Sequence, residues 1–176
     1  MKIFVNPYFY IYITVLLFFV PLPWMVAWAI SVIIHEFGHF LAVNICGQKV
    51  HTLKIGIAGA EMGCDDLSFM QKIFCILSGP FFGLIPVLFQ RFIPRISFCC
   101  WLLTIYNLLP IYPLDGGKVL YIILNKNLYK ILQIIFCCIM MGISIYAAVF
   151  MGLGILPVAI TLGLWMKSRN IPCKQH

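Results

Sequence analysis

Apolar stretches long enough to cross a lipid bilayer recur along almost the whole chain, and this pattern constrains the fold more than any other feature. A transmembrane helix needs about 20 mostly apolar residues, because the hydrocarbon core of a bilayer is about 30 Å thick. Apolar stretches occur at about 3–22, 24–46, 69–90, 96–124, 128–150 and 153–166. The sequence therefore predicts an all-α polytopic membrane protein with about six transmembrane helices.

The composition excludes other classes of protein. Hydrophobic residues make up 63% and charged residues 10% of the 176 residues, against about 45–50% and about 25% in soluble proteins. These values exclude a soluble globule, a disordered chain, a collagen-like rod and a coiled coil. The net charge of +7 does not indicate nucleic-acid binding, because the Lys and Arg residues are scattered beside the apolar runs and form no basic stripe.

The basic residues also predict how the chain is oriented. Six spans place both termini on one side of the membrane, and all but two of the 12 Lys and Arg residues fall on that side. Only Arg91 and Arg95 fall on the other side. Because cytoplasmic loops carry the excess of Lys and Arg, we expect both termini to be cytoplasmic.

The N-terminal region resembles a signal peptide in part. Lys2, the apolar run after it and Ala27-Trp28-Ala29 imitate a cleavable leader with an A-x-A site. The apolar run is longer than a typical leader, and cleavage would cut the second stretch just before its histidines. We therefore expect the first stretch to be retained as a membrane span.

A polar connection at 48–66 separates the second and third stretches. Polar and apolar residues alternate from Val50 to Ile57, which is typical of a short strand. Gly56 near the end of this stretch, together with Gly59 and Gly63 after it, indicates a turn or a close backbone approach. We expect a β-hairpin-like loop here.

Two histidines and a glutamate in the second stretch indicate a metal site. His35-Glu36-Phe37-Gly38-His39 is an H-E-x-x-H motif, and residues four apart share one face of a helix, so both imidazoles can bind one ion. Glu36 lies beside them and can accept a proton from a metal-bound water. A chance match is disfavoured, because an acidic residue at the centre of a membrane helix costs about 2.5–3.5 kcal/mol.

Zinc fits this motif, and a catalytic zinc keeps three protein ligands and one open position. Asp115 is the best third ligand, because the other acidic residues outside the motif lie in the polar loop. Pro110, Gly116 and Gly117 surround it in a segment that must interrupt the fourth helix. In the expected orientation Asp115 reaches a depth similar to that of the histidines, on the cytoplasmic side of the membrane centre.

Other residues near these motifs are expected to have supporting roles. Asn107 either donates a hydrogen bond to a substrate carbonyl or makes a packing contact between helices, and both interpretations stay open. Ser78-Gly79-Pro80 permits close packing of the third stretch against the motif helix, and Gly38 is placed with it as a structural residue. The cysteines show no C-x-x-C spacing and are expected to be small hydrophobic residues.

The two motifs together resemble those of the site-2 proteases, a family of intramembrane zinc metalloproteases. That family carries H-E-x-x-H in one span and N-x-x-P-x-x-x-x-D-G in a later one. The second pattern stands here as Asn107, Pro110, Asp115 and Gly116. The stretch from Asn107 to Lys118 is most similar to the bacterial sporulation branch, which activates a sigma-factor precursor. The resemblance covers about 31–124.

The resemblance implies a single domain over 1–176, with a three-helix catalytic core at about 24–124 and accessory spans at about 3–22, 128–150 and 153–166. It implies one Zn²⁺ per chain, a membrane or membrane-associated protein substrate, and a membrane protein that regulates or inhibits cleavage. It also implies a bacterial cell membrane, with the site towards the cytoplasm. The sporulation proteases carry a C-terminal CBS domain, so the sequence is expected to be either a truncated piece or a smaller relative with different regulation.

The expected reaction is peptide hydrolysis within the membrane. His35, His39 and Asp115 would hold zinc, Glu36 would move a proton from water to the leaving amine, and Asn107 would assist at the oxyanion. A polar cavity open to the cytoplasm is expected to admit water, and the strand at 50–57 is expected to offer an edge for an extended substrate. The main alternative is an intramembrane metal-ion or proton transporter, since buried ionisable groups also mark ion pathways. A catalytically silent scaffold is disfavoured because no motif residue is missing.

Overall fold

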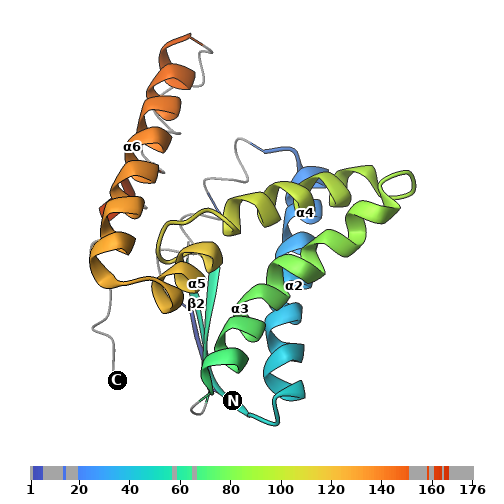
Figure 1. Ribbon diagram of the computed structural model, residues 1–176. Coiled ribbons are helices and arrows are strands. Elements are labelled where there is room, and N and C mark those ends of the chain that lie inside the picture. Colours follow the sequence, from blue (N-terminus) through green and yellow to red (C-terminus); the bar gives the residue numbers. More distant parts are fainter. Residues whose placement is uncertain are drawn as a thin grey trace. The chain divides into compact units, whose positions relative to one another are not determined.

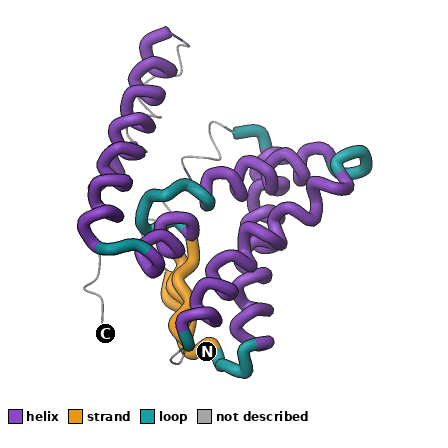
Figure 2. The backbone as a smooth tube through the Cα atoms, in the orientation of Figure 1, coloured by secondary structure: helices purple, strands orange, loops and turns teal. Residues whose placement is uncertain are grey.

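A computed structural model describes residues 2–5, 14, 20–56, 59–64, 67–150, 158, 161–163 and 165–166 (Figure 1, Figure 2). The chain divides into two compact units, Met1–Asn107 and Leu108–His176. Each unit is described by itself below, and the two are called the first and the second unit.

Three helices form the body of the first unit. They are α2 (Leu22–Ile45), α3 (Phe69–Leu84), which continues into the 3₁₀ helix η1 (Ile85–Phe89), and α4 (Pro94–Asn107). Each of α2, α3 and α4 packs against the other two, and Figure 1 shows α3 and α4 joined by a tight turn. Three mutually packed helices are therefore present in the first unit, while the expected bounds of the catalytic core, about 24–124, stay a prediction.

Small side chains allow α2 and α3 to approach each other closely. The buried residues of α2 recur three or four positions apart and include Ser31, Gly38 and Ala42, so they form one face. The buried residues of α3 are small as well, among them Ser78 and Gly79. Interfaces between membrane helices favour such residues because the backbones can then come close.

The polar loop forms a hairpin, as the sequence predicts, and gains a third strand. Strand β2 (Val50–Gly56) pairs antiparallel with β3 (Gly59–Cys64). Strand β1 (Lys2–Val5) pairs parallel with β2 on its other side, so the order is β1-β2-β3. The expectation that the 50–57 strand offers an edge is therefore wrong, because β2 is the central strand. The two outer strands are β1 and β3.

Strand β1 also changes the expected beginning of the first membrane span. Residues 2–5 are extended because they pair with β2, so no helix begins at about residue 3. Apart from Thr14 and residues 20–22, the rest of that expected span lies outside the described residues.

In the second unit, a short irregular segment precedes helix α5 (Asp115–Ile123), and α6 (Lys126–Phe150) packs against α5. The hydroxyl of Tyr129 on α6 accepts a hydrogen bond from the backbone N–H of Tyr112, at 3.1 Å. Tyr129 is fully buried and packs edge-to-face against Tyr121 of α5. Because α4 ends at Asn107 and α5 begins at Asp115, the helix break predicted from the Pro and Gly residues is confirmed.

Among the described residues, three helices are long and apolar enough to cross a membrane: Leu22–Ile45, Phe69–Phe89 and Lys126–Tyr146. Large apolar side chains on their outer faces are exposed, as Ile33 at 67% and Leu88 at 83% show. A chain that exposes such residues along long helices is suited to lipid and not to water. These features are those of an integral membrane protein. The expected count of about six spans stays a prediction, because much of 3–22 and 153–166 lies outside the described part.

Replacing Gly38 by alanine is expected to destabilise the first unit. The added Cβ would lie 2.7 Å from the carbonyl oxygen of Ser78 and 2.8 Å from Cβ of Phe82, so α2 and α3 would have to separate. Overpacking of this kind lowers the free energy of unfolding by about 1–3 kcal/mol. The measurement is denaturant unfolding of the full chain in detergent, with a metal chelator present.

Gly142 of α6 provides the matched control, since a Cβ added there meets no atom within 4 Å. Gly142→Ala is expected to be neutral or to stabilise the helix by about 0.5–1 kcal/mol. Equal stability of Gly38→Ala and the unchanged protein would show that the helix contact is not tight.

Candidate metal centre

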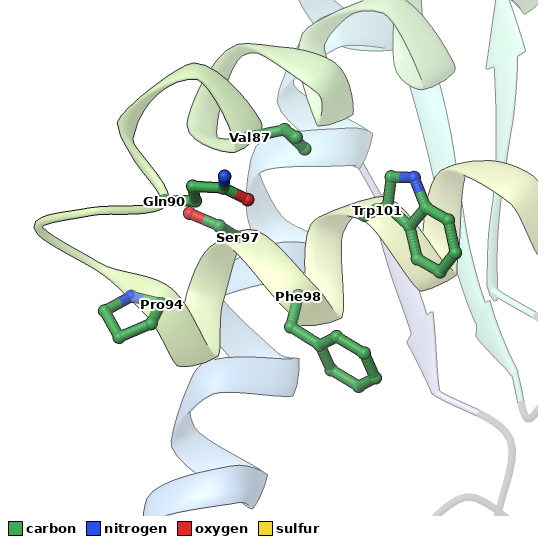
Figure 3. A pocket seen from close by; sticks show the side chains of 6 residues that line it. All are labelled: Val87, Gln90, Pro94, Ser97, Phe98 and Trp101. Carbon is green, nitrogen blue, oxygen red and sulfur yellow. The ribbon is translucent and has the colours of Figure 1, made fainter.

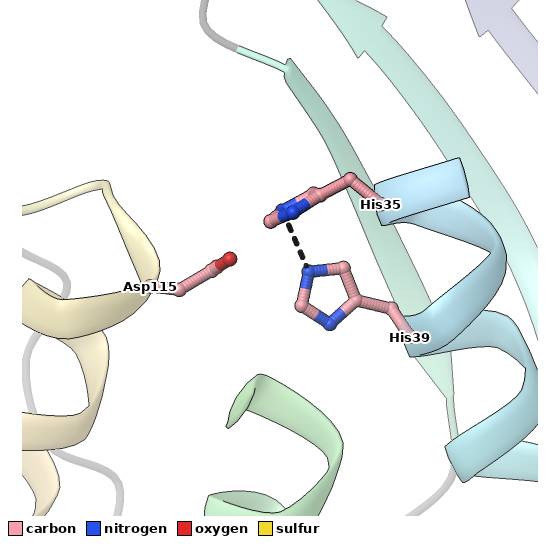
Figure 4. A group of neighbouring side chains, drawn as sticks. All are labelled: His35, His39 and Asp115. Carbon is pink, nitrogen blue, oxygen red and sulfur yellow. Dashed lines mark hydrogen bonds between the residues drawn. The ribbon is translucent and has the colours of Figure 1, made fainter. Parts of the chain in front are cut away.

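The two motif histidines point at each other from successive turns of α2. Their Nε2 atoms lie 3.3 Å apart, and their rings are almost perpendicular, at 86° (Figure 4). His35 is buried, with 3% of its surface exposed, and His39 is half-buried. The spacing of four residues therefore brings both Nε2 atoms to one point, as the helical face predicts.

A backbone carbonyl orients His39. Its Nδ1 lies 2.7 Å from the carbonyl oxygen of Cys75 on α3. Because a carbonyl oxygen only accepts, Nδ1 carries the hydrogen and donates it, which leaves the lone pair of Nε2 available for a metal. Histidine ligands of metals are usually held in this way by a partner at the other ring nitrogen.

The separation of the two Nε2 atoms fits one tetrahedral ion. Zinc–nitrogen distances of about 2.0–2.1 Å place two tetrahedral ligands about 3.3–3.4 Å apart. The observed separation is 3.3 Å. Two imidazole nitrogens held at this distance, one with its tautomer set by Cys75, therefore form a donor pair suited to zinc.

Glu36 stands on α2 between the two histidines, and its side chain is half-buried. Its neighbour Gly38 is buried and lies against α3. The motif helix thus carries two imidazoles and one carboxylate within about one and a half turns.

The Ser78-Gly79-Pro80 segment of α3 lies against the motif helix. A Cβ added at Gly79 would collide with the imidazole ring of His39. The hydroxyl of Ser78 donates to the carbonyl oxygen of Cys75, at 2.7 Å, and this oxygen also accepts from His39. Gly79 therefore leaves the space that the His39 ring occupies.

In the second unit, Asp115 is the first residue of α5 and is buried, with 3% of its surface exposed. A negative charge at this end of a helix is favourable because the first N–H groups point towards it. Its Oδ1 forms an ion pair with Nζ of Lys118, at 3.1 Å. Lys118 was not predicted to have a role, although its place three residues after an aspartate is the spacing of a helical ion pair.

The two glycines after Asp115 allow the preceding loop to fold against the first turn of α5. A Cβ at Gly116 would collide with the backbone of Leu108, and one at Gly117 would collide with the backbone of Ile111. Gly116 and Gly117 are both buried, and Pro110 is half-buried. The close approach explains why the segment needs residues without a side chain at both positions.

Asn107 ends α4 in the first unit. Its Nδ2 donates to the carbonyl oxygen of Leu103 in the same helix, at 3.1 Å. The structure thus shows a local contact of the side-chain amide. A contact with a substrate stays a prediction.

A separate cavity of about 530 Å³ lies where η1 turns into α4 (Figure 3). Its lining consists of Val87, Gln90, Pro94, Ser97, Phe98 and Trp101. None of these side chains is a metal ligand of the predicted set, and Ser97 already donates to the carbonyl oxygen of Pro86. This cavity is therefore not the polar cavity expected at the histidines, which stays a prediction.

Comparison with solved structures shows a clear similarity of fold. The chain matches the structure of the Site-2 Protease from Methanocaldococcus jannaschii with a TM-score of 0.65 and 18% sequence identity. The match covers 100% of this chain and 95% of the other. No protein-family model and no curated protein matches the chain. At this identity the comparison shows the fold.

Replacing Gly79 by alanine is expected to impair metal binding. The added methyl group would occupy space now held by the His39 ring, so Nε2 would move away from its position beside His35. Changes in the groups that orient a ligand weaken metal affinity by about 10–100-fold. The measurement is zinc competition against a chromophoric chelator, with the full chain in detergent.

Gly83 lies one turn further along α3 and serves as the control. A Cβ there would meet the hydroxyl oxygen of Thr104 and no histidine, so Gly83→Ala is expected to retain metal affinity. If both variants bound zinc equally well, Gly79 would not shape the position of His39.

Proposed function

We propose that the protein is an intramembrane zinc metalloprotease that hydrolyses peptide bonds of membrane-embedded or membrane-associated proteins near the cytoplasmic face. The observation that carries this proposal is the pair of Nε2 atoms at 3.3 Å, one of them oriented by Cys75. The fold shared with a site-2 protease supports it. The transporter alternative has no comparable support.

The proposed ligands are His35, His39 and Asp115, a set of residue types that could hold a metal ion. Both histidines offer Nε2, and Asp115 offers a carboxylate oxygen. Two imidazoles and one carboxylate are a donor set that catalytic zinc uses, with a fourth position left for water or substrate. One zinc ion per chain is proposed.

Zinc in this site would polarise the substrate carbonyl and make water more acidic. Glu36 then acts as the general base, because its carboxylate lies on the same helix as both imidazoles. It accepts a proton from the attacking water and delivers the proton to the nitrogen of the leaving amine. The same carboxylate thus serves both halves of the reaction.

Asn107 is proposed to assist at the substrate carbonyl. Its Nδ2 carries two hydrogens and uses one towards Leu103. The other hydrogen can be donated to the oxygen that gains negative charge during hydrolysis.

The substrate is proposed to bind in an extended form, because a helix hides its carbonyl groups in hydrogen bonds. An extended chain can add to the outer strand of a sheet. Since β2 is paired on both sides, the strand for such pairing is β1 or β3.

We place both termini and the site towards the cytoplasm of a bacterial cell. The pairing of β1 with β2 supports part of this orientation, because two hydrogen-bonded strands must lie on one side of a membrane. A green fluorescent protein fused to either terminus is expected to fluoresce, and an alkaline phosphatase fusion active at either end would contradict the orientation.

A sporulation sigma factor is the proposed substrate class, and a membrane protein is proposed to regulate cleavage.

Glu36→Gln is expected to abolish cleavage and to leave zinc binding unchanged. Glutamine keeps the size of the side chain but cannot accept the proton, and loss of a general base lowers the rate by about 10²–10⁴-fold. The measurement is cleavage of co-expressed membrane substrates together with the zinc content of the purified protein.

Two further variants complete this experiment. Asp115→Ala is expected to lose zinc as well as cleavage, whereas His51→Gln, on an exposed side chain of β2, should retain both. Cleavage by Glu36→Gln at the rate of the unchanged protein would rule out the proposed base. Metal flux without any cleavage by the unchanged protein would favour a transporter.

A further inference from the structure

Two thiols lie close together in the first unit and take no part in the proposed chemistry. The Sγ atoms of Cys46 and Cys75 are 3.9 Å apart. Cys46 follows the last residue of α2 and is half-buried, while Cys75 is buried inside α3. Both belong to one apolar cluster of the first unit, in which Cys64 of β3 also packs.

We propose that Cys46 and Cys75 are a reversible disulfide pair, and that closing the disulfide weakens metal binding at His39. The first part stands on the positions of the thiols alone. The second part rests on the proposed function, because it treats His39 as a zinc ligand.

The geometry of the first unit suits such a bond. A disulfide needs its sulfur atoms about 2.05 Å apart, so the two thiols must approach by roughly 1.9 Å. Cys46 lies at the end of a helix and is followed by Gly47 with φ of 75°, where the chain turns away from α2. The end of a helix can make such a movement more readily than its interior.

Cys75 connects the thiol pair to the histidine directly. Its carbonyl oxygen accepts the hydrogen bond from Nδ1 of His39, at 2.7 Å. Gly79, one turn further along, lies against the His39 ring. A pull on Cys75 towards Cys46 therefore displaces the group that orients the imidazole, and such losses weaken metal affinity by about 10–100-fold.

The reaction needs a two-electron oxidant, and a small-molecule disulfide such as oxidised glutathione supplies it. The half-buried Cys46 thiolate attacks one glutathione sulfur and releases the other as a thiol. The Cys75 thiolate then attacks the Cys46 sulfur, forms the protein disulfide and releases the second glutathione. Two protein thiols are oxidised, and one glutathione disulfide is reduced to two thiols.

Simple packing is the alternative, since free cysteines often serve as small buried hydrophobic residues. Packing explains a buried thiol such as Cys100, which is fully inaccessible. Packing alone predicts no change of zinc affinity on oxidation, whereas Cys46 of the close pair is half-buried, where an oxidant can reach it.

The experiment uses the full chain in detergent, first reduced and then freed of reductant. The protein is equilibrated with mixtures of oxidised and reduced glutathione, alkylated, digested and examined by mass spectrometry. A peptide joined through Cys46 and Cys75 is expected, and the reductant should remove it. Zinc affinity, measured by chelator competition, is expected to fall about tenfold on oxidation and to recover on reduction.

Three variants distinguish the pair from the neighbouring thiol. Cys46→Ser should form no such disulfide and keep its zinc affinity under oxidation, while Cys64→Ser should behave like the unchanged protein. Cys75→Ala tests the same bond from the buried side. Loss of the response in both Cys46→Ser and Cys75→Ala, with the response kept in Cys64→Ser, would locate it at the pair.

Other results would contradict one part of the proposal or the other. No disulfide, or one between Cys46 and Cys64, overturns the proposed pair. A Cys46–Cys75 disulfide with unchanged zinc affinity overturns the coupling to His39. If the reduced protein bound no zinc, the proposed function and the coupling to His39 would both be wrong. The presence or absence of the Cys46–Cys75 peptide would still test the proposed disulfide.

Discussion

The close approach of α2 and α3 is the contact on which the candidate metal centre depends. Gly38 faces the backbone of Ser78, and Gly79 faces the ring of His39. Without side chains at these two positions, the carbonyl oxygen of Cys75 can come within 2.7 Å of Nδ1 of His39. In a membrane no hydrophobic effect drives two apolar helices together, so packing of small residues and hydrogen bonds must do so. The same contact therefore holds the two helices together and orients the imidazole of His39.

In the second unit, the main structural constraint is the burial of the Asp115 carboxylate. Asp115 begins α5, where the free N–H groups of the helix favour its negative charge, and Lys118 pairs with it one turn later. The loop before it is held by the hydrogen bond between Tyr112 and the buried Tyr129. A buried ionised group requires such compensation, because transfer out of water without a partner is strongly unfavourable.

Much of this arrangement could be predicted from residue patterns, and the exceptions share a physical cause. The helical face of His35 and His39, the hairpin after residue 50 and the helix break before Asp115 are local, so spacing and turn residues predicted them. Strand β1 was missed because its four residues carry no strand pattern without their distant partner β2. The role of Cys75 was missed because it acts through a backbone oxygen, and any residue type could supply one.

The parallel pairing of β1 with β2 has a consequence for biosynthesis. Lys2 pairs with Thr52, so the first strand waits for a partner that is made about 50 residues later, which at about 5–20 residues per second takes several seconds. Throughout that interval the backbone groups of residues 2–5 lack their final hydrogen bonds. The sheet can therefore be completed only after the whole of α2 has been synthesised.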